Sequence, residues 1–214
     1  MVARLKAGAS ILDLGCCFGQ DLRHMAADGA PTEKMYSSDI IPEFWDISYD
    51  LYRDAGHMKA RFIPADVLDP ASPLVELQGK LDILLANQVF HLFDWERQVE
   101  AGKNMVALSR LGTWLVGYQI GSSVGRAVPV RTTTGGEAGG AGSKTKFFHT
   151  PETWREMWRQ VQRETGTEWE VESSLRPLKE WGLEDEDSAW MGPAARGFEF
   201  IVRRVDDYDL NGKD

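Results

Sequence analysis

The sequence predicts an α/β fold with a doubly wound, mostly parallel sheet. Short apolar segments alternate with helical patterns over the first 120 residues, which is the order that builds right-handed βαβ units. The clearest segment, residues 81–86, is almost continuously apolar, as a strand buried on both faces of a sheet requires. Two further strand patterns, residues 168–175 and 197–205, form a closing β pair.

The alternating elements can be placed in order along the chain. Five strands are predicted before the closing pair, at residues 10–14, 35–39, 61–65, 81–86 and 112–120. The third is weakened by Pro64, which has no N–H for the strand ladder. Four helices are predicted, from residue 19 onward and over 43–54, 95–109 and 151–165. Thr150 and Pro151 are typical of an N-cap and a first helical residue, so the last helix begins there.

The chain is expected to form one domain with a polar tail. Its 214 residues suffice for one core, so residues 1–205 are interpreted as a single domain and 206–214 as the tail. Residues 121–148 show no periodicity and are rich in glycine, which predicts a flexible lid loop. Four cations accompany one acid in this loop: Arg126, Arg131, Lys144 and Lys146 with Glu137. Their net charge of +3 would attract an anionic ligand, or it belongs to a solvated insertion.

The overall charge and the cysteine content exclude several classes of protein. A formal net charge of −9 repels phosphate backbones, so nucleic acid is not expected as a partner. Cys16 and Cys17 are adjacent, and neighbours in sequence rarely reach disulfide geometry. With no signal peptide and no apolar run long enough to cross a membrane, a soluble, cytoplasmic protein is expected. The sequence leaves the oligomeric state open.

The most informative segment is the turn after the first strand. Residues 13–20 read Asp-Leu-Gly-Cys-Cys-Phe-Gly-Gln and lead from a buried strand into a helix. Gly15 and Gly19 would allow a sharp turn and the close approach of a ligand to the helix N-terminus. Asp39 lies twenty residues after Gly19, where a carboxylate can accept hydrogen bonds from both ribose hydroxyls of a nucleoside cofactor. The alternative is a tight turn whose glycines serve packing alone.

The acids around the turn indicate which nucleoside cofactor would fit. A dinucleotide site has glycine at the middle position, where this chain has Cys17, and brings a diphosphate to the turn. Asp13 and Asp21 would be poorly placed beside a diphosphate, but Asp13 suits a cofactor with ammonium or sulfonium charge. Asp66 follows the third strand, where it could accept from an adenine amino group or cap a helix. The pattern favours S-adenosylmethionine over NAD.

Four segments resemble class I S-adenosylmethionine-dependent methyltransferases: residues 11–21, 39–53, 66–68 and 87–93. The glycine turn is similar to that of a group of O-methyltransferases from fungal secondary metabolism, some of which methylate a carboxylate of terpenoid or meroterpenoid intermediates. The resemblance implies a Rossmann-like, seven-stranded sheet whose last strand is antiparallel. It also implies a cofactor site, for which nine residues are candidates: Asp13, Gly15, Cys17, Gly19, Asp39, Ile40, Asp66, Val67 and Asn87.

The resemblance assigns parts of the cofactor to these positions. Residues 13–19 would shape the methionine end of the site. Asp39 would hold the ribose, and Ile40 would flank the adenine ring. Asp66 would bind the adenine amine, and Asn87 ends the fourth strand, where the family brings backbone groups against the cofactor amine.

The methyl acceptor is expected to be a small apolar molecule with an acidic group. A carboxylic acid with a pKa of about 4 is ionised at neutral pH, whereas a phenol with a pKa of about 10 needs a base. His91, just beyond the fourth strand, is the candidate catalytic residue; it could act as that base, donate a hydrogen bond to a carboxylate, or be a packed structural residue. His149 is interpreted as structural, and Trp181 and Trp190 as candidate walls of an acceptor pocket. The sequence shows no metal-ligand spacing.

Two rival functions stay open. An NAD(P)-dependent oxidoreductase of the short-chain type would need a Tyr-x-x-x-Lys pair after the fourth or fifth strand, and no such spacing occurs there. The second rival is a non-catalytic S-adenosylmethionine-binding remnant or partner subunit. It is kept because few residues precede the first strand, where family members carry N-terminal helices.

Overall fold

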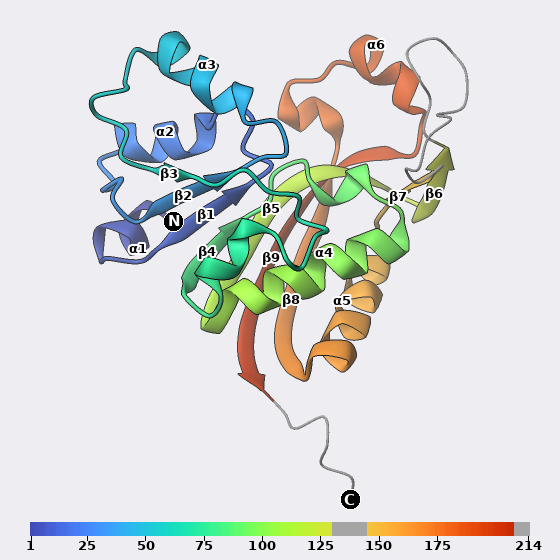
Figure 1. Ribbon diagram of the computed structural model, residues 1–214. Helices are drawn as coiled ribbons and strands as arrows, with labels where there is room; N and C mark the ends of the chain where they lie inside the picture. Colours follow the sequence, from blue (N-terminus) through green and yellow to red (C-terminus); the bar gives the residue numbers. More distant parts are fainter. Residues whose placement is uncertain (130–144, 208–214) are drawn as a thin grey trace, which may run out of the picture.

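The computed structural model describes residues 1–129 and 145–207, and a seven-stranded sheet forms its centre (Figure 1). The strands of this sheet are β1 (Ile11–Leu14), β2 (Met35–Ser38), β3 (Arg61–Phe62), β4 (Leu81–Leu85), β5 (Ser109–Ser122), β8 (Thr167–Arg176) and β9 (Ala195–Asp207). They lie in the order β3-β2-β1-β4-β5-β9-β8. β1 to β5 are parallel, and β9 runs antiparallel to both of its neighbours, which confirms the predicted fold class.

Helices connect the strands and cover the sheet. The α-helices are α1 (Val2–Lys6), α2 (Gln20–Ala27), α3 (Glu43–Tyr52), α4 (Trp95–Leu108), α5 (Pro151–Thr165) and α6 (Asp185–Ser188). Short 3₁₀-helices are η1 (Pro73–Leu77), η2 (Phe90–Leu92), η3 (Leu178–Trp181) and η4 (Ala189–Met191). Helix α1 was not predicted from the sequence.

Apolar side chains are buried on both faces of the sheet, so the fold is doubly wound. On one face, α1, α2 and α3 contribute Leu5, Leu22 and Trp45 to a buried cluster. On the other face, α4 and α5 contribute Met105 and Trp154 to a second cluster. Figure 1 shows α4 and α5 side by side, away from α2 and α3. The strand order reverses between β1 and β4, so a crevice for a ligand lies outside the carboxyl ends of these strands.

The ends of several elements differ from the prediction. β3 stops at Phe62, two residues before Pro64, and is shorter than predicted. β9 includes Asp206 and Asp207, which had been placed in the tail; residues 208–214 lie outside the described residues. The start of α5 is confirmed, because the Thr150 hydroxyl accepts from the Thr153 N–H at 3.3 Å in a capping box.

The prediction that residues 121–148 form a loop without regular structure is wrong at both of its ends. β5 continues to Ser122, and β6 (Arg126–Pro129) pairs with β7 (Thr145–Phe148) in a two-stranded antiparallel sheet. The two strands have four residues each, too few to show a periodic pattern in the sequence. Residues 130–144, with the glycine-rich stretch, lie outside the described part of the chain.

Candidate active site

The turn between β1 and α2 is built from three residues with left-handed backbone conformations. Gly15, Cys17 and Gly19 have φ angles of 67°, 49° and 64°. A Cβ atom on Gly19 would lie 2.4 Å from the ring of Trp45, so this position also requires glycine for packing. Cys17 adopts this conformation although it carries a side chain, at a cost of about 1–2 kcal/mol for a non-glycine residue in this region.

Asp39 joins the end of β2 to this turn. Its Oδ2 accepts from the Cys17 N–H at 2.9 Å, and its Oδ1 accepts from the Ile41 N–H at 3.0 Å. Each carboxylate oxygen has a further lone pair, so Asp39 can still accept from two hydroxyl groups. The neighbouring Ile40 is 66% exposed and lies free beside the turn, as a residue that flanks a ligand ring must.

Asp13 is a buried acid at the centre of the site. It is 2% exposed, and its Oδ2 has no hydrogen-bond partner among the described residues. Burial raises the pKa of Asp13 well above its ordinary value, and the nearby Asp21 and Asp39 raise it further. Such a cluster would stabilise a positively charged ligand and would repel a diphosphate. The residues present therefore fit the ammonium and sulfonium groups of S-adenosylmethionine.

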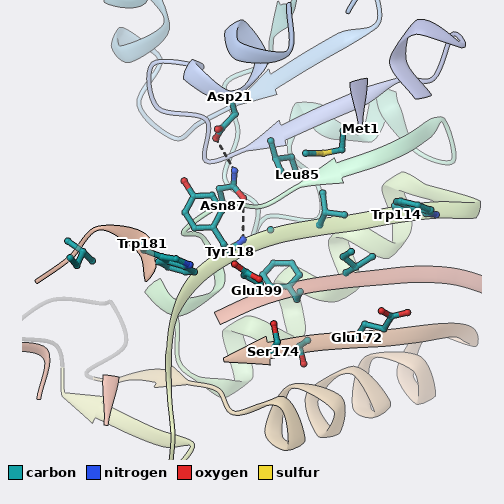
Figure 2. Close-up of a pocket in the computed structure, with 16 residues that line it drawn as sticks. Met1, Asp21, Leu85, Asn87, Trp114, Tyr118, Glu172, Ser174, Trp181 and Glu199 are labelled. Carbon is teal, nitrogen blue, oxygen red and sulfur yellow. Dashed lines mark hydrogen bonds between the residues drawn. The ribbon is translucent and has the colours of Figure 1, made fainter. Parts of the chain in front are cut away.

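Asn87 links the end of β4 to α2 and β5 (Figure 2). Its Nδ2 donates to Asp21 Oδ2 at 2.9 Å, and its Oδ1 accepts from the Tyr118 N–H at 3.2 Å. From the sequence, Asp21 indicates only that a diphosphate would fit poorly at the turn. Its contact with Asn87 was not predicted. Its position in the first turn of the helix that follows the glycines was the available clue.

Asp66 and Val67 lie beyond the end of β3. Asp66 Oδ1 accepts from the Leu68 N–H at 2.9 Å, and no α-helix begins there. The alternative reading of Asp66 as a helix N-cap is therefore not supported. The neighbouring Ala65 N–H donates to the Asp39 carbonyl at 3.1 Å, which brings the segment with Asp66 beside Asp39. The Val67 carbonyl accepts from Asn104 at 2.8 Å, and its side chain packs partly against the core.

His91 lies in η2 on the wall of a cavity of about 570 Å³. Its backbone N–H donates to Gln119 Oε1 at 3.1 Å, whereas its Nδ1 is buried without a hydrogen-bond partner in the described part of the chain. Burial, and to a smaller extent the nearby Lys146, together lower the pKa of His91 to about 4. The imidazole is therefore neutral at physiological pH, and it would be a weak base.

His149 belongs to the core, as interpreted from the sequence. It is 0% exposed, its Nε2 is 2.8 Å from Gln98 Oε1, and its Nδ1 is 3.0 Å from the Thr153 hydroxyl. The Gln98 Nε2 donates to two backbone carbonyls, so Gln98 Oε1 must accept from His149. The ring is thus the neutral tautomer with its proton on Nε2, and burial lowers its pKa to about 3.

A larger cavity of about 1040 Å³ lies over β5, β9 and β8, on the face that also carries α1 to α3 (Figure 2). Asp21 and Asn87 line this cavity. Trp181 also lines it, and its ring lies 5.4 Å from that of Tyr118. Trp190 instead lines the smaller cavity beside His91. The two tryptophans proposed as pocket walls therefore line different cavities.

Two negative findings apply to residues 1–129 and 145–207. No helix there is both long and apolar enough to cross a membrane. No three side chains of the metal-binding types gather into a site there.

The fold and the acids at its strand ends define a nucleoside-binding α/β protein, and comparison with known proteins identifies its family. Residues 11–112 match the family described as "Methyltransferase domain". The chain is 37% identical to O-methyltransferase phiE of Fungal sp. (strain ATCC 74256), over 96% of this chain and 70% of phiE. It is 35% identical to Asnovolin E/Chermesin D methyltransferase nvfJ of Aspergillus novofumigatus, over 79% of this chain and 59% of nvfJ.

A solved S-adenosylmethionine-dependent methyltransferase from Methanosarcina mazei has the same fold, with a TM-score of 0.63 at 15% identity and 93% of each chain covered. That likeness shows the shared fold, and the family match together with the similarity to phiE shows that the chain belongs to the methyltransferases. The chain spans between 57% and 62% of the length of seven other curated relatives that it matches.

Proposed function

We propose that the chain transfers a methyl group from S-adenosylmethionine to an oxygen of a small secondary metabolite, such as a terpenoid or meroterpenoid intermediate. The observation that carries the proposal is the buried Asp13 carboxyl, whose Oδ2 lacks a hydrogen bond to the described residues and lies among other acids. The names of the relatives support the acceptor class: phiE is an O-methyltransferase, and nvfJ is an asnovolin E/chermesin D methyltransferase.

The cofactor would lie along the carboxyl ends of β1, β2, β3 and β4. Asp13, with Asp21 held by Asn87, would face its positively charged methionine end. Gly15, Cys17 and Gly19 would form the backbone cradle of the turn. Further along, Asp39 would accept hydrogen bonds from the ribose hydroxyls, and Ile40 would cover one side of the adenine ring. The adenine amino group would lie at Asp66 and Val67 and donate to the Asp66 carboxylate.

The cofactor supplies a methyl group on sulfonium sulfur, so the C–S bond breaks as the new C–O bond forms. The task of the protein is to align the acceptor oxygen and to exclude water. A carboxylate acceptor arrives ionised, and no proton has to leave. A hydroxyl acceptor would have to lose a proton, and His91, with a pKa of about 4, is poorly suited to take it. The site therefore favours a carboxylate acceptor.

Calorimetric titration of the protein with S-adenosylhomocysteine and with NAD tests the cofactor assignment. We expect saturable binding of the former and none of NAD. Asp39→Asn should weaken the binding of S-adenosylhomocysteine by about 10–100-fold, because one oxygen that accepts from the ribose is lost. The matched control is Asp46→Asn, an exposed acid of α3 outside the site. Tight NAD binding, or equal affinity in both variants, would overturn the assignment.

Methyl transfer itself needs a separate assay, because a non-catalytic cofactor-binding subunit would pass the titration. Incubation with S-[methyl-³H]adenosylmethionine and a panel of terpenoid and polyketide acids should yield labelled ester. Binding of the cofactor without label in any acid would favour the non-catalytic alternative.

The free thiols of Cys16 and Cys17 support the further proposal that the protein acts in the cytoplasm, a reducing compartment.

A further inference from the structure

The hairpin of β6 and β7 has two different faces. In its antiparallel register Arg126 is opposite Phe148 and Val128 is opposite Lys146. Residues two apart on a strand share a face, so these four side chains stand on one side of the hairpin. All four line the smaller cavity. The other face carries Phe147, whose ring packs edge-on against Trp95 of α4 at 5.0 Å.

The lining of the smaller cavity is positively charged. Arg126 and Lys146 belong to it, and none of the described residues that line it is Asp or Glu, although the chain has a net charge of −9. Neither cation forms a salt bridge with any acid in the described part of the chain. The Arg126 guanidinium reaches across to Gly192 after η4, 3.7 Å from where a Cβ atom would stand. Among residues 1–129 and 145–207, no carboxylate would therefore compete with an anion in the cavity for these two cations.

The remainder of the lining is apolar. Phe148 and Val128 come from the hairpin, Ile120 from the end of β5, and Trp190 and Met191 from η4. Trp190 is 78% exposed, which is unusual for a side chain that buries so much apolar area when covered. The volume of about 570 Å³ lies within the range of about 300–1,000 Å³ that is typical of sites for small molecules.

A short segment connects this cavity to the cofactor site. It runs from Asn87, which binds Asp21, to His91, which lines the cavity. Gln88 between them has a left-handed φ of 58°, and its N–H donates to the Tyr118 carbonyl at 2.7 Å. This reversal of the chain places Asn87 and His91 on two sides of the same turn at the carboxyl end of β4. The cavity and the proposed methionine end are therefore joined by one short connection after β4, with Asn87 at one end of it and His91 at the other.

From these observations we infer that the smaller cavity binds the methyl acceptor, and that the acceptor is an apolar molecule with an anionic oxygen group held by Arg126 and Lys146. The apolar body lies against Phe148, Trp190 and Met191. The inference rests on the proposed function, because it takes the bound molecule to be the acceptor. It adds the location of the site and two residues that determine specificity.

A matched pair of probes tests this inference: abietic acid, a tricyclic diterpenoid carboxylic acid, and abietinol, the corresponding primary alcohol. Both are titrated into the protein saturated with S-adenosylhomocysteine, and tryptophan fluorescence is recorded. We expect the acid to bind at least about tenfold more tightly than the alcohol, because only the acid forms charge-assisted hydrogen bonds. Trp190→Ala should weaken both probes by a similar factor.

The double variant Arg126→Gln/Lys146→Gln should lower the affinity for the acid to that for the alcohol and leave the alcohol unchanged. Lys59→Gln/Arg155→Gln is the control, because it removes the same charge at two exposed positions outside both cavities. Equal affinities of the two probes in the wild type, no saturable binding of either below about 100 µM, or an unchanged preference in the double variant would overturn the inference. Binding of S-adenosylhomocysteine in every variant checks folding, and its absence in the wild type would refute the proposed function instead.

Discussion

Asp13 combines burial, an oxygen without a hydrogen bond to the described residues and two acidic neighbours. Burial is the largest cause of its raised pKa, followed by Asp21 and Asp39. An isolated acid of this kind lowers the stability of the folded protein, because its charge is neither solvated nor paired. A ligand with positive charge removes that penalty by favouring the ionised carboxylate. The raised pKa of Asp13 and its energetic penalty therefore apply to the protein without a bound cofactor.

A proton should leave Asp13 when the cofactor binds. Because the pKa of Asp13 is raised in the free protein, a cation beside it lowers that pKa, and the affinity for S-adenosylmethionine should increase as the pH rises through the raised value. Calorimetry in two buffers with different ionisation enthalpies measures the released proton. Asp13→Asn should abolish the release and weaken binding. Identical heats in both buffers throughout this pH range would contradict the prediction.

Cys17 occupies a backbone conformation that side chains disfavour. Cys17→Gly should raise the free energy of unfolding by up to about 1 kcal/mol, the relief of the left-handed penalty less the greater entropy of glycine in the unfolded chain. Cys17→Val should instead lower it by about 1–2 kcal/mol, because a branched Cβ fits this region worst. Urea unfolding measures both. A valine variant as stable as the glycine variant would show that the turn relaxes to another conformation.

The single residues differ in how far the sequence alone could identify them. Asp13 lies near the end of β1, whereas Asp39 and Asp66 come after β2 and β3, so a common position at one edge of the sheet could be predicted for all three. The role of Asp21 depends on Asn87, which is 66 residues away and meets it only after β4 lies beside β1. The orphaned Nδ1 of His91 is likewise a consequence of packing. Partners that are distant in sequence leave no local pattern.

At the scale of elements, the contact of α4 with α5 depends on a glycine inside a helix. A Cβ atom on Gly102 would lie 2.9 Å from Cγ2 of Val161. Glycine is unfavourable in a helix by about 1 kcal/mol relative to alanine, so its presence in α4 is explained by the close approach of α5. The two helices carry much of the cluster on one face of the sheet, with Met105 and Trp158 among its buried members.

Whether Gly102→Ala raises or lowers the free energy of unfolding should depend on Val161. In the wild type we expect it to lower the free energy of unfolding by about 1–2 kcal/mol, because the added methyl group overpacks the contact. In a Val161→Ala background the space is free, and the same substitution should raise stability by up to about 1 kcal/mol through helix propensity. A double-mutant cycle by urea unfolding gives the coupling. Equal effects of Gly102→Ala in both backgrounds would rule out the steric explanation.

Elements with strong periodicity or caps could be predicted, and the hairpin could not. The alternating strands and helices up to β5 follow from apolar segments, and α5 follows from Thr150 and Pro151. β6 and β7 are short, partly exposed on both faces, and paired across an intervening segment of the chain. Their pairing depends on the core beneath them rather than on their own composition.

At the scale of the whole molecule, two buried histidines link stability to pH. Burial lowers the pKa of His149 to about 3 and that of His91 to about 4, whereas both are about 6.5 in an unfolded chain. The unfolded state therefore binds protons first as the pH falls, and the histidine contribution to stability is complete above about pH 6.5 and declines toward pH 3. Asp13, whose pKa is raised, acts in the opposite direction and offsets part of this decline.

Removal of His149 should flatten the dependence of stability on pH. Between about pH 6 and pH 4 the slope for His149→Phe should be smaller than that of the wild type by up to about 1.4 kcal/mol per pH unit, the value for one titrating group. Urea unfolding over a pH series measures the slope. His24→Phe is the control, because the His24 side chain is 81% exposed. An unchanged slope in the His149 variant would mean that His149 titrates normally in the folded protein.

The overall architecture could be predicted, whereas the sequence indicated single residues of the smaller cavity, such as Trp190 and Arg126, but not the cavity itself. Five parallel strands and a closing pair follow from local patterns, and the cofactor side follows from strand ends. The smaller cavity is assembled from η2, the end of β5, the hairpin and η4, which are separated by long stretches of chain. Trp190 and Arg126 carry no sign in the sequence that they meet across one space.

The two faces of the β6–β7 hairpin have different surroundings: one packs against the core, and the other lines the smaller cavity. One face is anchored in the core through Phe147 and the neighbouring His149, and substitutions there would release the hairpin from α4. The other face presents Val128 and Phe148 to the smaller cavity. Divergence among related enzymes can therefore act on the cavity face, changing which metabolite is accepted while the scaffold and the methyl donor site stay as they are.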